Sequence, residues 1–275
     1  MKEEKIENIQ RKLELITGKW WFFLIFILIQ FIIPPYASKG YKLGEQGMVI
    51  GEILNHAIAH NFTKLYPVFK IISIILVISI FFLRNKVTRL FSFYAAISYV
   101  LFAFLQNIAV TEKYGLGIVT INFLMFLVVA ALWFWEVIAG KNDFTPRKQP
   151  VWKYWVVPFA FLAFWYPVNM NTLRPDFNPL YLFTNMAGLA FCMMTPVYLG
   201  ILTLFYPRVN IATLRVTSLV GIIIALYNII AIFPNLRVLW WNGVLHIPLL
   251  AISIYALVIS LQKIPVEETR EDYNK

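Results

Sequence analysis

The sequence has only one cysteine and three histidines in 275 residues. Cys192 has no second cysteine with which to pair, so the chain forms no intrachain disulfide and no thiolate metal cluster. Charged residues make up 14% of the chain, well below the usual share of about 25% in soluble proteins. HExxH, glycine-rich phosphate loops and basic stripes with interleaved aromatics are also missing. These absences argue against common soluble enzymes and against nucleic-acid binding.

Long apolar runs dominate what is present. Hydrophobic residues form 60% of the chain and gather in stretches close to the length that crosses a bilayer, about 20 residues in a helix. The sequence therefore predicts an all-α, polytopic transmembrane helical bundle of about eight spans. The predicted spans are residues 20–35, 66–83, 90–110, 115–140, 151–168, 180–206, 211–233 and 239–261.

The runs leave little room for anything outside the bundle. Residues 1–19 carry charges of both signs, with Ile6, Ile9, Leu13 and Ile16 at helical spacing, which predicts an amphipathic helix on the membrane surface. Residues 20–262 form one bundle of eight helices, and residues 263–275 form a charged tail.

Positive charges predict the orientation in the membrane. With the N-terminus inside, seventeen of the 24 Lys and Arg residues fall on the cytoplasmic side and six on the other, and Lys70 lies within a span. We expect a multi-pass protein of the cell membrane with both termini in the cytoplasm. Within the spans, Glu136 lies near the inner surface, and Lys70 is expected to reach water at the outer one.

One connection is much longer than the others. Residues 36–65 lie outside in this topology, and a structureless loop of that length is uncommon in a compact protein. Residues 46–59 therefore predict a short helix that re-enters the outer leaflet or lies along it. Gly47 and Gly51, four residues apart, would allow close packing against a span.

The short helix carries a polar stripe that contains two of the three histidines. His56 and His60 are four residues apart, a spacing that lets two imidazoles on one helical face bind one metal ion, and Glu52 lies one turn earlier. His246 begins the last span on the same side. These residues predict a metal site with His56, His60 and His246 as ligands and Glu52 as a ligand or general base, with zinc favoured over haem. A polar site without metal and simple interface packing are the alternatives.

Polar residues, most of them uncharged, also gather on the outer side. Because such groups need partners when lipid surrounds them, they favour a water-accessible vestibule that opens outward. The candidates are Asn107, Glu112, Asn185 and Asn242, with Gln106, Tyr166 and Asn228 near them.

Three functions are compatible with this pattern. The first is a metal-dependent membrane enzyme that acts on a lipid or another hydrophobic molecule reached from the bilayer. The second is a transporter of a small solute or ion with an outward-facing binding site. The third is a non-catalytic membrane subunit. The sequence leaves the choice among them open.

Overall fold

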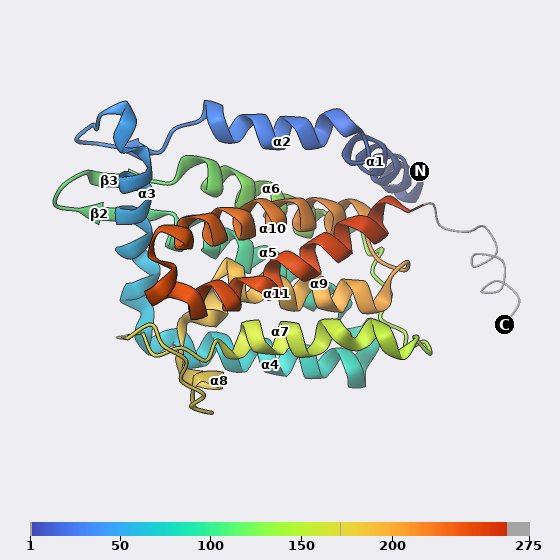
Figure 1. The fold of residues 1–275 in the computed structure, drawn as a ribbon. Coiled ribbons are helices and arrows are strands. Elements are labelled where there is room, and N and C mark those ends of the chain that lie inside the picture. The colour runs from blue at the N-terminus through green and yellow to red at the C-terminus, as the bar shows by residue number, and fades with distance from the viewer. Residues whose placement is uncertain (1, 171, 263–275) are drawn as a thin grey trace, which may run out of the picture.

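The computed structural model describes residues 2–170 and 172–262 and is predominantly helical, which confirms the predicted all-α class. The predicted charged tail, residues 263–275, lies outside the described residues. Long helices run side by side along one direction (Figure 1). They are α4 (Tyr66–Leu83), α5 (Thr88–Leu101), α6 (Thr120–Ala139), α7 (Val156–Trp165), α9 (Phe191–Phe205), α10 (Ile211–Ile232) and α11 (Leu236–Leu261).

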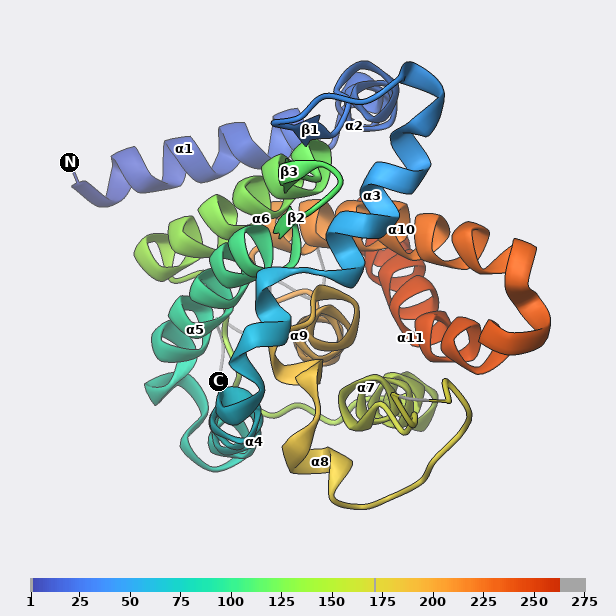
Figure 2. The same ribbon diagram turned by 90° about the vertical axis from the view of Figure 1, so that its left-hand side faces the viewer.

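Helix α9 occupies the centre of the bundle (Figure 2). Twelve of its residues are buried, and α7, α10 and α11 pack around it. The core beside it is rich in aromatic rings. Phe191 stacks on Phe126 of α6 at 4.2 Å between ring centroids, and the Tyr99 hydroxyl of α5 lies 3.1 Å from the Thr195 hydroxyl. Apolar helices of this kind satisfy their own backbone hydrogen bonds, which is what a bilayer requires.

A small antiparallel sheet covers one end of the bundle, which we call the sheet end. Its strands are β1 (Tyr36–Ala37), β2 (Ile108–Thr111) and β3 (Gly115–Ile118), in the order β1-β3-β2. Helix α3 (Gln46–Asn55) runs across this end (Figure 1) and buries Val49 and Ile53 against the sheet. A Cβ atom on Gly117 would lie 2.6 Å from Ile53, so this position requires glycine. The short helix was predicted, but the strands were not.

The other end of the bundle, which we call the opposite end, is where α4 ends and α7 begins. Helix α1 (Lys2–Thr17) confirms the predicted N-terminal helix, and α2 (Trp20–Ile32) follows it after a bend of 65°. Gln10 of α1 is buried and donates a hydrogen bond of 3.0 Å to Asn210. The helix therefore packs against the bundle as well as carrying a charged face.

Within the described residues, five helices are long and apolar enough to cross a membrane, or up to seven if each bent pair counts as one span. Each predicted run contains a helix, but α2, α7 and α9 have 13, 10 and 15 residues. A straight crossing needs about 20. The structure therefore supports a membrane bundle without establishing eight spans.

Candidate functional site

The site begins with a broken helix. Helix α8 (Tyr181–Thr184) and the 3-10 turn η6 (Met186–Leu189) precede α9, and the direction changes by 94° at the break. The Asn185 side chain caps the turn by accepting a hydrogen bond of 3.1 Å from the Ala187 amide. Gly188 permits a close approach to α4, since a Cβ atom there would lie 3.1 Å from the backbone nitrogen of Lys70. The first turn of α9 consequently lies inside the bundle.

A pocket of about 220 Å³ lies at this break. Its walls are formed by residues of α6, α9, α10, α11 and η6, by the turn η4 (Phe102–Gln106) that follows α5, and by the end of α7. Helix α3 and the turn η2 (Ile58–Leu65) contribute the side nearest the sheet end. Its polar lining consists of Gln106, Asn107, Asn122, Asn228, Asn242, Tyr166, Cys192, His60 and His246. None of its lining residues is Asp, Glu, Lys or Arg. The pocket is therefore polar and formally uncharged.

Hydrogen bonds hold the polar walls in place. The Gln106 Oε1 atom accepts a bond of 2.8 Å from the amide of Phe191, one of the α9 donors that the helix itself leaves unpaired. The Tyr166 hydroxyl donates to Asn242 Oδ1 at 3.0 Å. The Asn228 amide nitrogen donates to the Ile224 carbonyl at 2.8 Å. These contacts fix the orientation of the side chains before any ligand binds.

His246 is 5% exposed, and its tautomer follows from a single contact. Its Nδ1 atom lies 2.7 Å from the Asn242 carbonyl oxygen, which can only accept, so Nδ1 carries the hydrogen. In the neutral ring, Nε2 is then an acceptor. The pocket thus combines amide groups, which both donate and accept, with an imidazole acceptor and a phenol hydroxyl.

Four of the residues predicted from sequence meet in this pocket: His60, His246, Asn107 and Asn242. Asn185 lies beside it and donates to the Trp165 carbonyl at 2.7 Å. Three others do not line the pocket. Glu112 is exposed in the turn between β2 and β3, while Glu52 and His56 belong to the end of α3.

The predicted metal site is not supported. No group of three or more His, Cys, Asp or Glu side chains in the described part of the chain is arranged to hold a metal ion. Helix α3 ends at Asn55, and Ala57 is extended with φ −55° and ψ 142°, so the five residues from His56 to His60 do not form a helical turn. His56 instead folds back on its own helix, with Nδ1 3.0 Å from the Glu52 carbonyl oxygen and 3.4 Å from the Glu52 carboxylate.

Two polar residues of the pocket were not predicted from the sequence. Asn122 was hidden inside the predicted span 115–140, although an amide in an apolar helix is itself an indication of a polar site. Cys192 was considered only as a lone cysteine that excludes a disulfide and a thiolate metal cluster, and it lines the pocket. Its place in the pocket depends on the break before α9, which has no proline and was not predicted.

Lys70 and Glu136 are two of the charged side chains that are buried in the bundle outside this pocket. Lys70 is 0% exposed, so the expectation that it reaches water is wrong. Its Nζ donates to the Phe164 carbonyl near the end of α7 and lies 3.9 Å from the centre of the Phe164 ring. Glu136 accepts hydrogen bonds of 2.8 Å from the Asn142 amide and the Asn210 side chain. Both groups connect helices, and neither lines the pocket.

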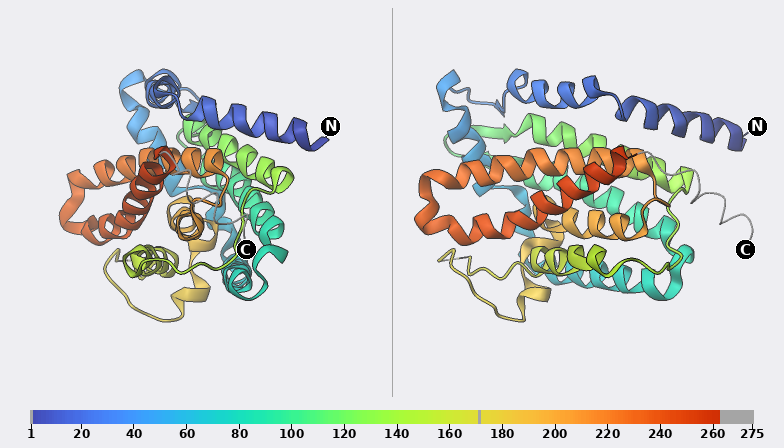
Figure 3. Two further views of the ribbon diagram at one scale, coloured as in Figure 1. Left: turned by 90° about the vertical axis from the view of Figure 1, so that its right-hand side faces the viewer. Right: turned by 45° about the vertical axis from the view of Figure 1, so that its right-hand side comes forward.

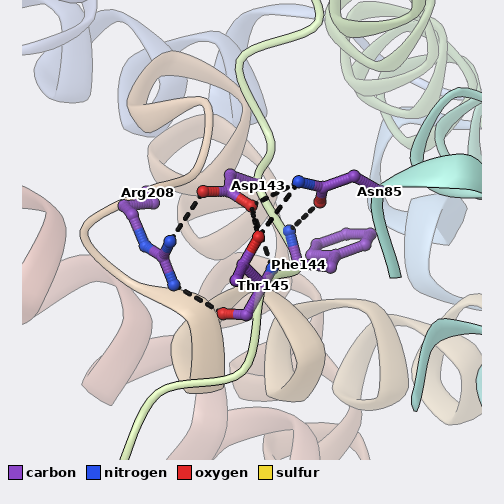
Figure 4. Close-up of polar contacts among 5 residues, drawn as sticks. All are labelled: Asn85, Asp143, Phe144, Thr145 and Arg208. Carbon is purple, nitrogen blue, oxygen red and sulfur yellow. Dashed lines mark hydrogen bonds and ion pairs between the residues drawn. The ribbon is translucent and has the colours of Figure 1, made fainter. Parts of the chain in front are cut away.

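A second polar cluster lies at the opposite end (Figure 4). Asp143 accepts hydrogen bonds from Asn85 at 2.7 Å and from the Thr145 hydroxyl at 2.6 Å, and pairs with Arg208 at 2.7 Å. Burial acts to raise the pKa of Asp143, but the bonds from Thr145 and Asn85, with the Arg208 charge, outweigh it and hold the pKa below its ordinary value. The cluster joins three connections between helices.

Comparison with family models, curated proteins and solved structures gave no match to this chain. The fold and the pocket together define a helical bundle of the membrane type with an internal, uncharged polar site. Function must therefore be argued from this site.

Proposed function

We propose that the protein is a multi-pass membrane transporter that binds a small, uncharged, hydrogen-bonding solute in the pocket at the break before α9. The bundle would span the membrane with the sheet end outside and both termini in the cytoplasm, as the charge asymmetry predicts. The pocket would then be the outward-facing binding site.

The uncharged lining of the pocket is the observation that carries the proposal. Five of its residues bear side-chain amides, and none bears a formal charge. A charged solute would lose its hydration there without meeting a counter-charge, which is strongly unfavourable. A neutral solute with both donors and acceptors would replace its bonds to water with bonds to amides, Tyr166 and His246.

The volume limits the size of the solute. Pockets that hold drug-sized ligands measure roughly 300 to 1,000 Å³. The pocket here is smaller, at about 220 Å³. The ligand is therefore a compact molecule rather than a lipid or an extended chain.

The broken helix supports transport over simple binding. Transporters commonly build their solute sites from interrupted helices near the middle of the bundle, since the break exposes backbone groups that a continuous helix would hide. Here α9 begins inside the bundle, with Phe191 only 1% exposed.

Solute flux into proteoliposomes tests the proposal. Vesicles that contain the full-length protein should take up at least one of urea, glycerol and formamide faster than protein-free vesicles. Asn228→Leu keeps the branched side-chain shape but removes an amide from the wall, and it should reduce that flux about fivefold, the effect of one lost hydrogen bond.

Asn235→Leu is the matched control, since Asn235 follows the same helix but does not line the pocket. It should leave the flux unchanged. Equal effects of the two substitutions, or flux that never exceeds that of empty vesicles, would contradict the proposal.

A further inference from the structure

A second hollow in the molecule is almost entirely apolar. It is a groove of about 430 Å³ between α4 and α7, with α9 as its floor. The two helices lie apart with α9 above the gap between them (Figures 2 and 3). Ile78 and Phe81 of α4 face Val157 and Phe161 of α7 across it, and Gly200 of α9 contributes no side chain. Nothing in this lining resembles the amide-rich pocket.

The groove follows the axis of the bundle. Its lining on α4 extends from Ser73 to Phe81, which is eight helical steps or about 12 Å at a rise of 1.5 Å per residue. Leu182 of α8 lines it toward the sheet end, and Val156, the first residue of α7, lines it toward the opposite end. An elongated apolar slot of this kind suits a hydrocarbon chain.

Positive charge surrounds the opposite end of the groove. Residues 84–89 follow α4 and residues 145–153 lead into α7, and these two stretches contain six Lys and Arg residues but no Asp or Glu. Gln149 donates a hydrogen bond of 3.1 Å to the carbonyl of Leu204, a groove residue, which holds the second stretch beside the groove. Arg84, Lys86 and Lys148 are exposed.

We propose that this groove binds one acyl chain of an anionic phospholipid, whose phosphate is held by the cations at the opposite end. The apolar walls recognise the chain, and the positive connections select the headgroup, because six cations gather there and the Asp143 carboxylate, which contacts both stretches, is already paired with Arg208. The inference is independent of the solute that the polar pocket takes.

Native mass spectrometry of the full-length protein in detergent tests the proposal. Phosphatidylglycerol and phosphatidylcholine with identical acyl chains are added in turn. Phosphatidylglycerol should bind at least about fivefold more tightly, because each Lys or Arg near an anionic headgroup contributes about fivefold in affinity. Equal affinity for the two lipids would overturn the anionic selectivity.

Filling the groove provides the second arm. Ile78 lines the groove and is 49% exposed, whereas Ile75 on the same helix is 56% exposed and lies outside it. Ile78→Trp should weaken both lipids at least about fivefold, while Ile75→Trp, the matched control, should not. Val157→Trp fills the groove from α7 and should act like Ile78→Trp. If both fillers matched Ile75→Trp, the groove assignment would be wrong.

Removing charge provides the third arm. The double variant Arg84→Gln and Lys86→Gln should abolish the preference for phosphatidylglycerol while phosphatidylcholine binding stays constant. Lys42→Gln with Lys64→Gln removes two exposed charges near the sheet end and should preserve the preference. Loss of preference in both double variants would show a general charge effect and overturn the assignment to the groove. A dimer that Ile78→Trp dissociates would instead identify the groove as an interface between copies.

Discussion

Cys192 gives the pocket a built-in reporter. It is the single cysteine of the chain and lines the pocket, where the Asn228 amide nitrogen lies 3.6 Å from its sulfur. Its neighbours are uncharged, and the Nδ1 contact of His246 leaves that ring as an acceptor. A thiol reagent that enters the pocket therefore meets the same walls as a natural solute.

We predict that the charge of a thiol reagent decides its rate of reaction with Cys192. Methyl methanethiosulfonate, which is small and neutral, should modify the purified protein at least about tenfold faster than the sulfonate and trimethylammonium reagents of the same chemistry. Moving a charged group into the pocket without a counter-charge costs well over 1.4 kcal/mol, the free energy that corresponds to a tenfold difference in rate. Mass spectrometry at timed intervals measures the three rates.

An exposed cysteine calibrates these rates. Thr63 is exposed, so Thr63→Cys combined with Cys192→Ser places the only thiol in water. After correction by this control, faster modification of Cys192 by either charged reagent than by the neutral one would show that the pocket accepts that charge.

The short elements near the sheet end explain why the structure does not support the predicted metal site, although several residues of the polar pocket were named from the sequence. The residues before Asn55 follow a helical period, but the helix ends there and the chain continues in an extended conformation at Ala57. Neither glycine nor proline marks this end, and the local signals for a helix stop are Asn55 and His56, residue types that are common at helix C-termini. The packing of Val49 and Ile53 against the sheet fixes α3, and such contacts between distant segments have no local pattern.

The break before α9 is a second example. The run 180–206 contains Pro196, the usual cause of an interruption, yet Pro196 lies inside α9. The chain breaks instead at Ala190, after the turn that Asn185 caps and Gly188 packs against α4. The apolar composition predicted a span, but only the neighbours of the run determine where it bends.

The Asp143 cluster joins three connections between helices, so its loss should destabilise the folded protein. Asp143→Asn keeps the side-chain shape but removes the charge that pairs with Arg208, so we expect a loss of about 1 to 2 kcal/mol at neutral pH. For a chain of this size, that corresponds to a fall in the unfolding midpoint of roughly 2 to 8 °C, measured by thermal scanning in detergent.

The free energy of unfolding should also depend on pH in acid, with a sign set by the lowered pKa of Asp143. The folded protein keeps Asp143 ionised at a pH where the unfolded chain takes up a proton, because its pKa lies below the ordinary value of about 4. Its contribution is therefore complete above that value and declines as the pH falls through the lowered pKa. Asp143→Asn should remove this part of the acid dependence. Glu112→Gln, at an exposed position, should reproduce the wild-type curve.

Sequence and structure agree best on the bundle as a whole. Each apolar run contains a helix, since runs of this length can satisfy their backbone only that way in lipid. The prediction that polar residues near one end share a site was also useful, because His60, Asn107, Asn242 and His246 line one pocket. The central place of α9, the sheet and the apolar groove depend on packing among segments far apart in the chain, and no local periodicity encodes them.

The orientation of the bundle is the last prediction and follows from charge. Glu112 lies in the β2–β3 turn at the sheet end, and Lys148 lies in the connection before α7 at the opposite end. Both are exposed. In a Cys192→Ser background, Glu112→Cys should react with a membrane-impermeant maleimide added to intact cells, and Lys148→Cys should react only after the membrane is permeabilised. The reverse pattern would invert the protein and turn the pocket toward the cytoplasm. Labelling of both positions in intact cells would show that the bundle does not cross the membrane, because its two ends would share one side.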